Sequence, residues 1–186
     1  MVSGFSGILF GFQHLNMTRT PGKKATRPCG CGYAGDPNGR CRCTPPQIRR
    51  YLAKLSGPLL DRVDMHVEVP RLPYEALRAT AQRPEGSAAV AARVATARER
   101  QGQRGALNAR LNTAELQRAC ALGLREHGLL ENASRRLGLS ARACHRVQRV
   151  ARTIADLGGQ EGVGVAELSE AIGYRRLDRE PLIVTR

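Results

Sequence analysis

Two closely spaced cysteine pairs constrain this chain more than any other feature of its sequence. Cys29-x-Cys31 and Cys41-x-Cys43 lie within fifteen residues, on either side of a Gly-Asp-Pro-Asn-Gly segment that is typical of a turn. If that turn reverses the chain, four thiolates come together, and four soft sulfur ligands in a tetrahedron suit Zn²⁺. A loop this short cannot bury enough apolar surface to hold itself, so a metal would supply the order of this cysteine loop, residues 29–43. The C-x-C spacing is tighter than the C-x2-C of many zinc sites, which leaves a metal-free cysteine-rich loop as the alternative.

The charge of the chain favours a polyanionic partner. Its 186 residues carry a formal net charge of +14, and nucleic acid is the first candidate for such a basic chain. Of the 30 basic residues 27 are arginine, which a GC-rich coding sequence would also produce. We expect no signal peptide, because the apolar N-terminus lacks a basic n-region and a small-residue cleavage site, and no run approaches the roughly 18–20 apolar residues that a membrane span needs. We therefore expect a cytoplasmic protein with reduced thiols and no membrane partner.

Helix start and stop signals are clear in the C-terminal half. Asn112-Thr-Ala-Glu115 is typical of a capping box, Ser140 can cap the next long helix, and Gly138 and Gly158 are stop signals. Aromatic residues make up only 4% of the chain, which favours small helical units with an aliphatic core. The sequence thus predicts a mainly α fold, with helices over 47–54 behind Pro45-Pro46, 88–101 capped by Ser87, 113–121, 125–137, 141–157 and 166–172. Before them, alternating valines and polar residues over 63–69 predict a half-buried strand that ends at Pro70.

The helix predicted over residues 141–157 has two faces. Its apolar face consists of Val147, Val150, Ala151, Ile154 and Leu157, at the period expected for an amphipathic helix. Arginines recur every three or four residues along a separate stripe. We predict that Arg146, Arg149 and Arg152 contact DNA phosphates without sequence preference, and a solvated arginine face is the alternative. A second basic cluster lies near the cysteine loop, at Arg40, Arg42, Arg49, Arg50 and Lys54. Cys120 and Cys144 fall within predicted helices and are expected to be buried as small apolar residues.

An aspartate–arginine segment, Gly57-Pro-Leu-Leu-Asp61-Arg62-Val-Asp64, precedes the predicted strand. Together with the cysteine loop it resembles the C-terminal part of a magnesium-chelatase-like AAA+ ATPase of the ComM/YifB type, a family associated with competence and DNA branch migration. The resemblance implies that Arg62 is an arginine finger, which neutralises charge on the γ-phosphate of a neighbouring subunit in a hexameric ring. Leu139-Ser140-Ala-Arg142 resembles a sensor-2 segment, which makes Arg142 a second nucleotide-facing arginine. From the residues alone, Arg62 could instead pair with Asp61 or Asp64, and Arg142 could be an ordinary surface residue.

The nucleotide-binding motifs of such an ATPase are missing from this chain. There is no G-x4-G-K-[ST], and Gly22-Lys23-Lys24 lacks both the preceding glycine and the hydroxyl for Mg²⁺. No apolar strand ends in Asp-Glu, and Arg27 stands where the family has its sensor-1 asparagine. We therefore expect an ATPase fragment truncated at its N-terminus, inactive by itself, which binds neither ATP nor Mg²⁺ alone. The alternatives are a stand-alone zinc-stabilised nucleic-acid-binding or regulatory module, or an inactive gene remnant.

The resemblance also implies an organisation of the chain into segments. It covers the chain from Pro28 to about Arg179, so that the expected fold is a helical AAA+ lid-type bundle behind a remnant of an α/β core. The expected segments are 1–27, unmatched and disordered; 28–72, the end of the core; 73–105, a linker and helix; 106–179, the helical lid domain; and 180–186, a tail.

Overall fold

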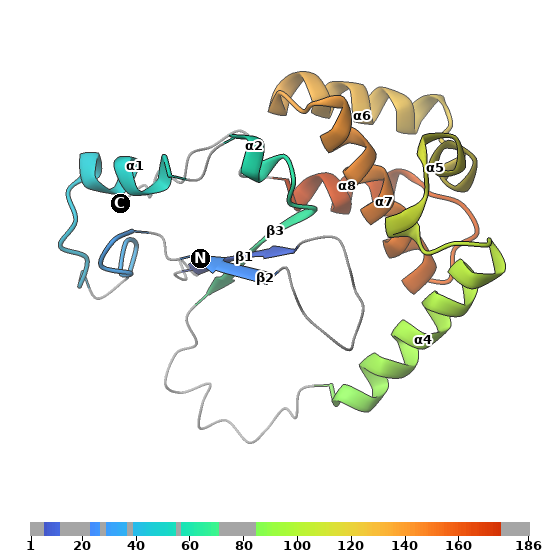
Figure 1. The fold of residues 1–186 in the computed structure, drawn as a ribbon, viewed down its shortest axis with the longest axis horizontal. Helices are drawn as coiled ribbons and strands as arrows, with labels where there is room; N and C mark the ends of the chain where they lie inside the picture. Colours follow the sequence, from blue (N-terminus) through green and yellow to red (C-terminus); the bar gives the residue numbers. More distant parts are fainter. Residues whose placement is uncertain are drawn as a thin grey trace.

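The computed structural model describes residues 6–11, 23–26, 29–36, 39–54, 57–70 and 85–175. It is mainly α-helical, as the sequence predicts. The C-terminal helices form one helical unit, which consists of α4 (Ser87–Gln103), the 3-10 helix η1 (Asn108–Arg110), α5 (Thr113–Cys120), α6 (Leu124–Leu137), α7 (Ala141–Leu157) and α8 (Val165–Gly173). In Figure 1 this unit lies on one side of the molecule, and α1 (Pro45–Leu52) and the cysteine loop lie on the other. Along the described residues, no helix combines the length and the apolar character that a bilayer crossing requires.

The capping signals read from the sequence act as expected in the helical unit. The Asn112 side chain accepts a hydrogen bond from the Glu115 amide at 2.9 Å, and the Glu115 carboxylate accepts one from the Asn112 amide at 2.8 Å. Ser140 accepts a hydrogen bond from the Ala143 amide at 3.1 Å and so begins α7. Gly138 ends α6 with a φ of 63°, a left-handed conformation that glycine adopts without steric cost. The cap of α4 differs from the expectation, because it is Gly86 and not Ser87.

The core of the unit lies around α7. Val147 and Ala151 are fully buried, and Val150 and Ile154 pack against the core, as the helical period predicts. Leu157 differs, because it occupies the last position of α7 and remains 40% exposed. Cys120 is buried in the core and Cys144 packs against it, which confirms the role expected for these two thiols. The buried core residues are Leu111, Leu116, Cys120, Leu130, Leu139, Ala143, Val147, Ala151, Ala155, Val163, Leu168 and Ala171.

A small antiparallel sheet precedes the helical unit. Its strand order is β2-β1-β3, with β1 at Ser6–Gly11, β2 at Lys23–Thr26 and β3 at Met65–Pro70. In the register, Ile8 pairs with Glu68 on β3 and with Thr26 on β2. Both β1 and β2 lie within residues 1–27, the segment expected to be unmatched and disordered. Sequence reasoning missed these strands because ladder hydrogen bonds to an open strand edge require only backbone groups and leave little mark on the side chains.

The predicted strand ends at Pro70 and Val63 is buried, both as expected, but the residues after Val63 present a different inward face. Among residues 64–67 the buried side chain is that of His66, and Met65 and Val67 are only partly buried. The His66 amide donates a hydrogen bond to the Tyr174 carbonyl at 2.7 Å, next to the C-terminal end of α8. This contact with a residue 108 positions away sets which face is covered, and the local alternation of residues cannot reveal it.

Candidate functional site

The cysteine loop folds back on itself through tight turns. Gly32, Gly35 and Gly39 have φ values of 84°, 72° and 65°, a region that residues with a side chain rarely occupy. Backbone hydrogen bonds close the turns, from the Gly32 amide to the Cys29 carbonyl at 3.1 Å and from the Gly39 amide to the Asp36 carbonyl at 2.9 Å. The glycines thus allow the chain reversal on which the convergence of the two cysteine pairs depends.

All four cysteines of the loop converge. Their Sγ atoms lie within 4.8 Å of one another, and those of Cys29 and Cys41 are 3.8 Å apart. Cys31 lies 3.3 Å from Cys29 and 3.7 Å from Cys41. Zn–S bonds of about 2.3 Å at tetrahedral angles place neighbouring sulfurs about 3.8 Å apart, so the C-x-C spacing does not prevent such a site. The four thiols could hold a metal ion.

Backbone amides support the thiolate form that a metal requires. The Ala34 amide donates a hydrogen bond to Cys29 Sγ at 3.2 Å, and Cys29 is fully buried. Amide donors at Tyr33 and Arg42 lower the pKa of Cys31 to about 6. Burial raises the pKa of Cys41 to about 11, and the neighbouring thiols of Cys31 and Cys29 act in the same direction. The loop therefore offers sulfur ligands whose negative charge an ion would balance.

The second site is a pocket of about 420 Å³ between the turn after α2 (Gly57–Leu60) and the start of α7. Arg62 and Arg142, the two arginines singled out in the sequence, both line it, although 80 positions separate them. Both side chains are exposed, and neither forms a hydrogen bond or ion pair within the described part of the chain. The other lining residues are Pro58, Leu60, Asp61, Gly138, Leu139, Ser140, Ala143 and Arg175.

Other partners occupy the carboxylates next to Arg62. Ser140 donates a hydrogen bond to Asp61 Oδ1 at 2.6 Å, and Arg146 forms an ion pair with Asp64. The alternative that Arg62 pairs with either aspartate is thus wrong in this structure. Burial raises the pKa of Asp64 against the opposing effect of Arg146. The turn that carries Arg62 is consequently tied to α7 on both sides of the arginine.

Arg175, to which the sequence analysis gave no role, bonds to the backbone of the same turn. Its side chain is only 1% exposed, and it donates hydrogen bonds to the carbonyls of Val63 and, at 3.5 Å, Leu60. These carbonyls flank Arg62 on the two sides, so a buried cation fixes the backbone from which Arg62 projects. An arginine just after a helix leaves no sign of this role in the sequence, because its acceptors are backbone carbonyls more than 110 residues earlier.

The arginines of the predicted DNA-contacting stripe on α7 bond to other parts of the protein. Arg152 is 1% exposed and donates hydrogen bonds to the carbonyls of Gln160 and Glu161, each at 2.7 Å. Arg146 is 9% exposed and paired with Asp64, and Arg149 donates to the Leu111 carbonyl at 2.9 Å. The three arginines lie on the side of α7 that other elements cover, and a helical period alone does not distinguish that side from a solvated one.

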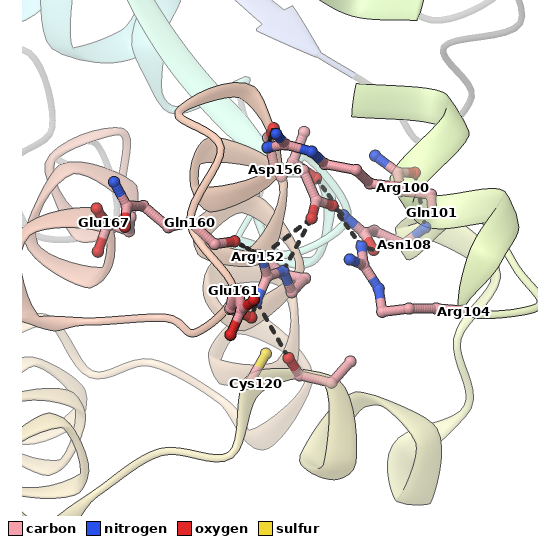
Figure 2. Close-up of polar contacts among 12 residues, drawn as sticks. Arg100, Gln101, Arg104, Asn108, Cys120, Arg152, Asp156, Gln160, Glu161 and Glu167 are labelled. Carbon is pink, nitrogen blue, oxygen red and sulfur yellow. Dashed lines mark hydrogen bonds and ion pairs between the residues drawn. The ribbon is translucent and has the colours of Figure 1, made fainter. Parts of the chain in front are cut away.

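Arg152 belongs to a buried polar network that Figure 2 shows in full. Asp156, with a fully buried side chain, accepts hydrogen bonds from Arg152 at 3.0 Å, from Arg104 at 2.5 Å and from Asn108 at 2.8 Å. Arg100 on α4 donates to the Asp156 carbonyl at 2.9 Å. The network joins α4, η1 and the loop after α7 to two residues of α7, Arg152 and Asp156, so its role is structural.

Known protein families match most of the chain. The family described as magnesium chelatase, subunit ChlI, matches residues 22–77, and the family of the ChlI C-terminal region matches residues 84–175. The chain belongs to the magnesium chelatase family. The C-terminal match includes α4, which the expected segments placed in the linker and helix of residues 73–105, before the lid domain. The first match begins before Pro28, where the resemblance was expected to start.

Relatives in this family are similar along the same residues. The chain is 47% identical over 148 residues to the competence protein ComM of Haemophilus influenzae, an alignment that covers 79% of this chain and 28% of that protein. It is 45% identical to the uncharacterized protein YifB of Escherichia coli, over 79% of this chain and 29% of YifB. An uncharacterized protein of Mycobacterium tuberculosis is 39% identical over 157 residues, which cover 82% of this chain and 30% of that protein. The chain thus spans less than a third of the length of these relatives.

Proposed function

We propose that this chain is the C-terminal part of a magnesium-chelatase-like ATPase subunit and supplies two arginines to a nucleotide site. One observation carries the proposal: Arg62 and Arg142 line the same pocket, exposed and unpaired within the described residues. An unpaired guanidinium held on a fixed turn can neutralise charge that develops on a transferred phosphoryl group. Arg62 acts as an arginine finger, and Arg142 contacts the same nucleotide from the first turn of α7.

The phosphate-binding residues of that site must come from outside this chain. The sequence has no G-x4-G-K-[ST] segment, so no loop of backbone amides cradles the phosphates and no hydroxyl is placed for Mg²⁺. Arginines alone recognise an anion but do not position it in line with an attacking water. Completion of the site by a neighbouring subunit of a ring is consistent with the exposure of both arginines.

The cysteine loop has a structural role in this proposal, as a zinc site. The four Sγ atoms match the spacing of a tetrahedral four-sulfur site, and the loop has little core of its own apart from Cys29 and Ala34. Cys43 directly precedes Thr44, the N-cap residue of α1. A bound zinc ion would therefore fix both the loop and the start of the helix. Because the same loop would be ordered in isolation, a stand-alone zinc-stabilised module remains the second candidate function.

A chimera tests the two candidates. This chain would replace the aligned C-terminal segment of the Haemophilus influenzae relative, which shares 47% identity with it, and ATP hydrolysis would be measured. We expect the chimera to hydrolyse ATP and Arg62→Ala to lower kcat by about 10³–10⁵-fold, the range for loss of an arginine finger. Arg118→Ala, an exposed arginine on α5, is the matched control and should change kcat little.

The isolated chain provides the complementary measurement. It should neither hydrolyse ATP nor bind it tightly, because it lacks the phosphate-cradling amides. Hydrolysis by the purified chain that disappears in Arg62→Ala would contradict the proposed division of the site. A chimera in which Arg62→Ala and Arg118→Ala are equally active would exclude the finger and favour the stand-alone module.

A further inference from the structure

The cysteine loop and α1 carry a basic surface on which a carboxylate pairs with one of the five cations. Five basic side chains lie between residues 39 and 54, and all five are exposed. The segment 29–54 contains a single acidic residue, Asp36, whose side chain is 2% exposed and paired with Arg40. No other basic residue of this segment has a carboxylate partner within the described part of the chain. We call these residues the loop patch, Arg40, Arg42, Arg49, Arg50 and Lys54.

The residues of the loop patch are linked through the four-thiol cluster and the cap of α1. Arg42 lies between Cys41 and Cys43, so both of its neighbours belong to the four-thiol cluster. The capping box of Thr44 and Gln47 then joins the loop to α1 without an intervening linker, with the Thr44 amide donating to Gln47 at 2.8 Å. Arg49 and Arg50 lie in the last turn of this helix, and Lys54 follows it. The five cations therefore lie on one continuous segment, residues 40–54, whose loop and helix are joined by hydrogen bonds.

The rest of the molecule does not neutralise this segment. Figure 1 shows α1 and the cysteine loop on the opposite side from helices α4–α8. Over residues 105–137 of the helical unit, by contrast, five arginines are accompanied by three glutamates, and Arg135 pairs with Glu131 at 2.5 Å. A zinc ion with four thiolates would carry a net charge of −2, but these charges lie inside the loop and accept amide hydrogen bonds. The arginines outside them face solvent.

We infer that the loop patch binds the phosphate backbone of nucleic acid. Guanidinium groups are weakly hydrated and bond to phosphate in a bidentate manner, and several unpaired cations on one segment match the repeated charge of such a backbone. Tyr33, 43% exposed with Arg40 stacked 4.6 Å from its ring centre, adds an aromatic surface of the kind that zinc knuckles use. Because α1 has only eight residues and presents no set of base-reading side chains, binding is indifferent to sequence. This inference stands independently of the proposed nucleotide site.

Matched charge reversals on the full chain test the inference. Arg49→Glu/Arg50→Glu changes the loop patch, and Arg135→Glu/Arg136→Glu changes an equivalent arginine pair in the last turn of α6 by the same total charge. Fluorescence anisotropy with a labelled mixed-sequence single strand would be measured at about 50 mM and about 200 mM salt. We expect the first variant to lose affinity on the order of tenfold or more, and its log–log salt slope to fall by about 1.4, twice the roughly 0.7 per phosphate contact of single strands. The α6 variant should retain affinity within about threefold.

Three outcomes would overturn the inference. Undetectable binding by the unmodified chain at the lower salt concentration would show that the loop patch is a solvated face whose arginines serve only the C-terminal carbonyls of α1. Equal losses in both variants would show a response to total charge without a defined surface. If vesicles with anionic lipid bind the chain through Arg49 and Arg50 while the oligonucleotide does not, the surface recognises lipid headgroups. Equal metal content and circular dichroism among the proteins ensure that a lost affinity is not a lost fold.

Discussion

Arginine has opposite roles in the two halves of this molecule. In the helical unit Arg104 and Arg152 direct their guanidiniums to Asp156, and Arg175 directs its own to backbone carbonyls. In the cysteine loop and α1, Arg42, Arg49 and Arg50 are exposed and have no carboxylate partner among the described residues. Several arginines of the helical unit therefore satisfy buried acceptors, whereas these three arginines of the cysteine loop and α1 remain available.

The two halves also differ in what holds them together. The helical unit has a continuous core of aliphatic side chains around α7. The cysteine loop has almost no core. Its four converging thiols can stabilise it in place of apolar contacts only when a bound metal ion balances their negative charge. Damage to one half should therefore leave the other folded.

The largest effect is expected from Asp156→Ala in the helical unit. The substitution leaves Arg152, 1% exposed, without its carboxylate, and removal of one partner of a buried ion pair costs about 3–5 kcal/mol. Urea denaturation of the two proteins, followed by circular dichroism, measures the difference in the free energy of unfolding. Glu131→Ala removes an exposed partner from the Arg135 pair and should cost no more than about 1 kcal/mol. A loss as small for Asp156→Ala would show that the network is not what ties α4 to α7.

The next effect concerns the cysteine loop alone. Cys43→Ser removes one of four ligands, so we expect the roughly one equivalent of zinc in the purified protein to be lost, together with hydrogen-exchange protection in α1. The urea transition of the helical unit should stay where it is, because no core residue of that unit lies in the loop. Cys144→Ser, a partly buried thiol against the core, is the matched control and should retain the metal. Protein purified under reducing conditions without zinc would exclude the metal site.

The contrast between the halves also explains what could be predicted from the sequence. Local signals were sufficient for the helices: Ala141–Leu157 has the predicted bounds, and the Asn112 capping box and the Gly138 stop are where their chemistry places them. The convergence of Cys29, Cys31, Cys41 and Cys43 was predictable for the same reason, since a short glycine-rich turn leaves two pairs few other arrangements.

Long-range partners could not be predicted in this way. Arg146 finds Asp64 across 82 positions and Arg175 finds the Val63 carbonyl across 112, so nothing near either arginine indicates its burial. The stripe on α7 therefore had the same period as a solvated face, although Arg146 and Arg152 are buried and Arg149 is partly buried. Arg62 and Arg142 were identified by a family resemblance, and their meeting in one pocket became visible only in three dimensions.

The smallest effect is expected at His66, where β3 contacts the helical unit. Burial, reinforced by the nearby Arg175 guanidinium, lowers the pKa of His66 to about 4. The native state then keeps the imidazole neutral below its ordinary pKa of about 6.5, whereas the unfolded chain takes up a proton. This contribution to stability is complete above pH 6.5 or so and is lost as the pH falls toward about 4.

A comparison of two histidine variants isolates that contribution. In His66→Leu, the decrease in the free energy of unfolding between about pH 6.5 and pH 4 should be shallower than in the unmodified protein. His127→Leu, at an exposed position on α6, should keep the original slope. Asp64, whose pKa burial raises, acts in the opposite direction in acid, because its native form accepts a proton more readily; it is present in all three proteins and cancels from the comparison. Identical slopes in the two variants would mean that His66 is in contact with solvent. Its protonation would then not contribute to the loss of stability in acid at the contact between β3 and Tyr174.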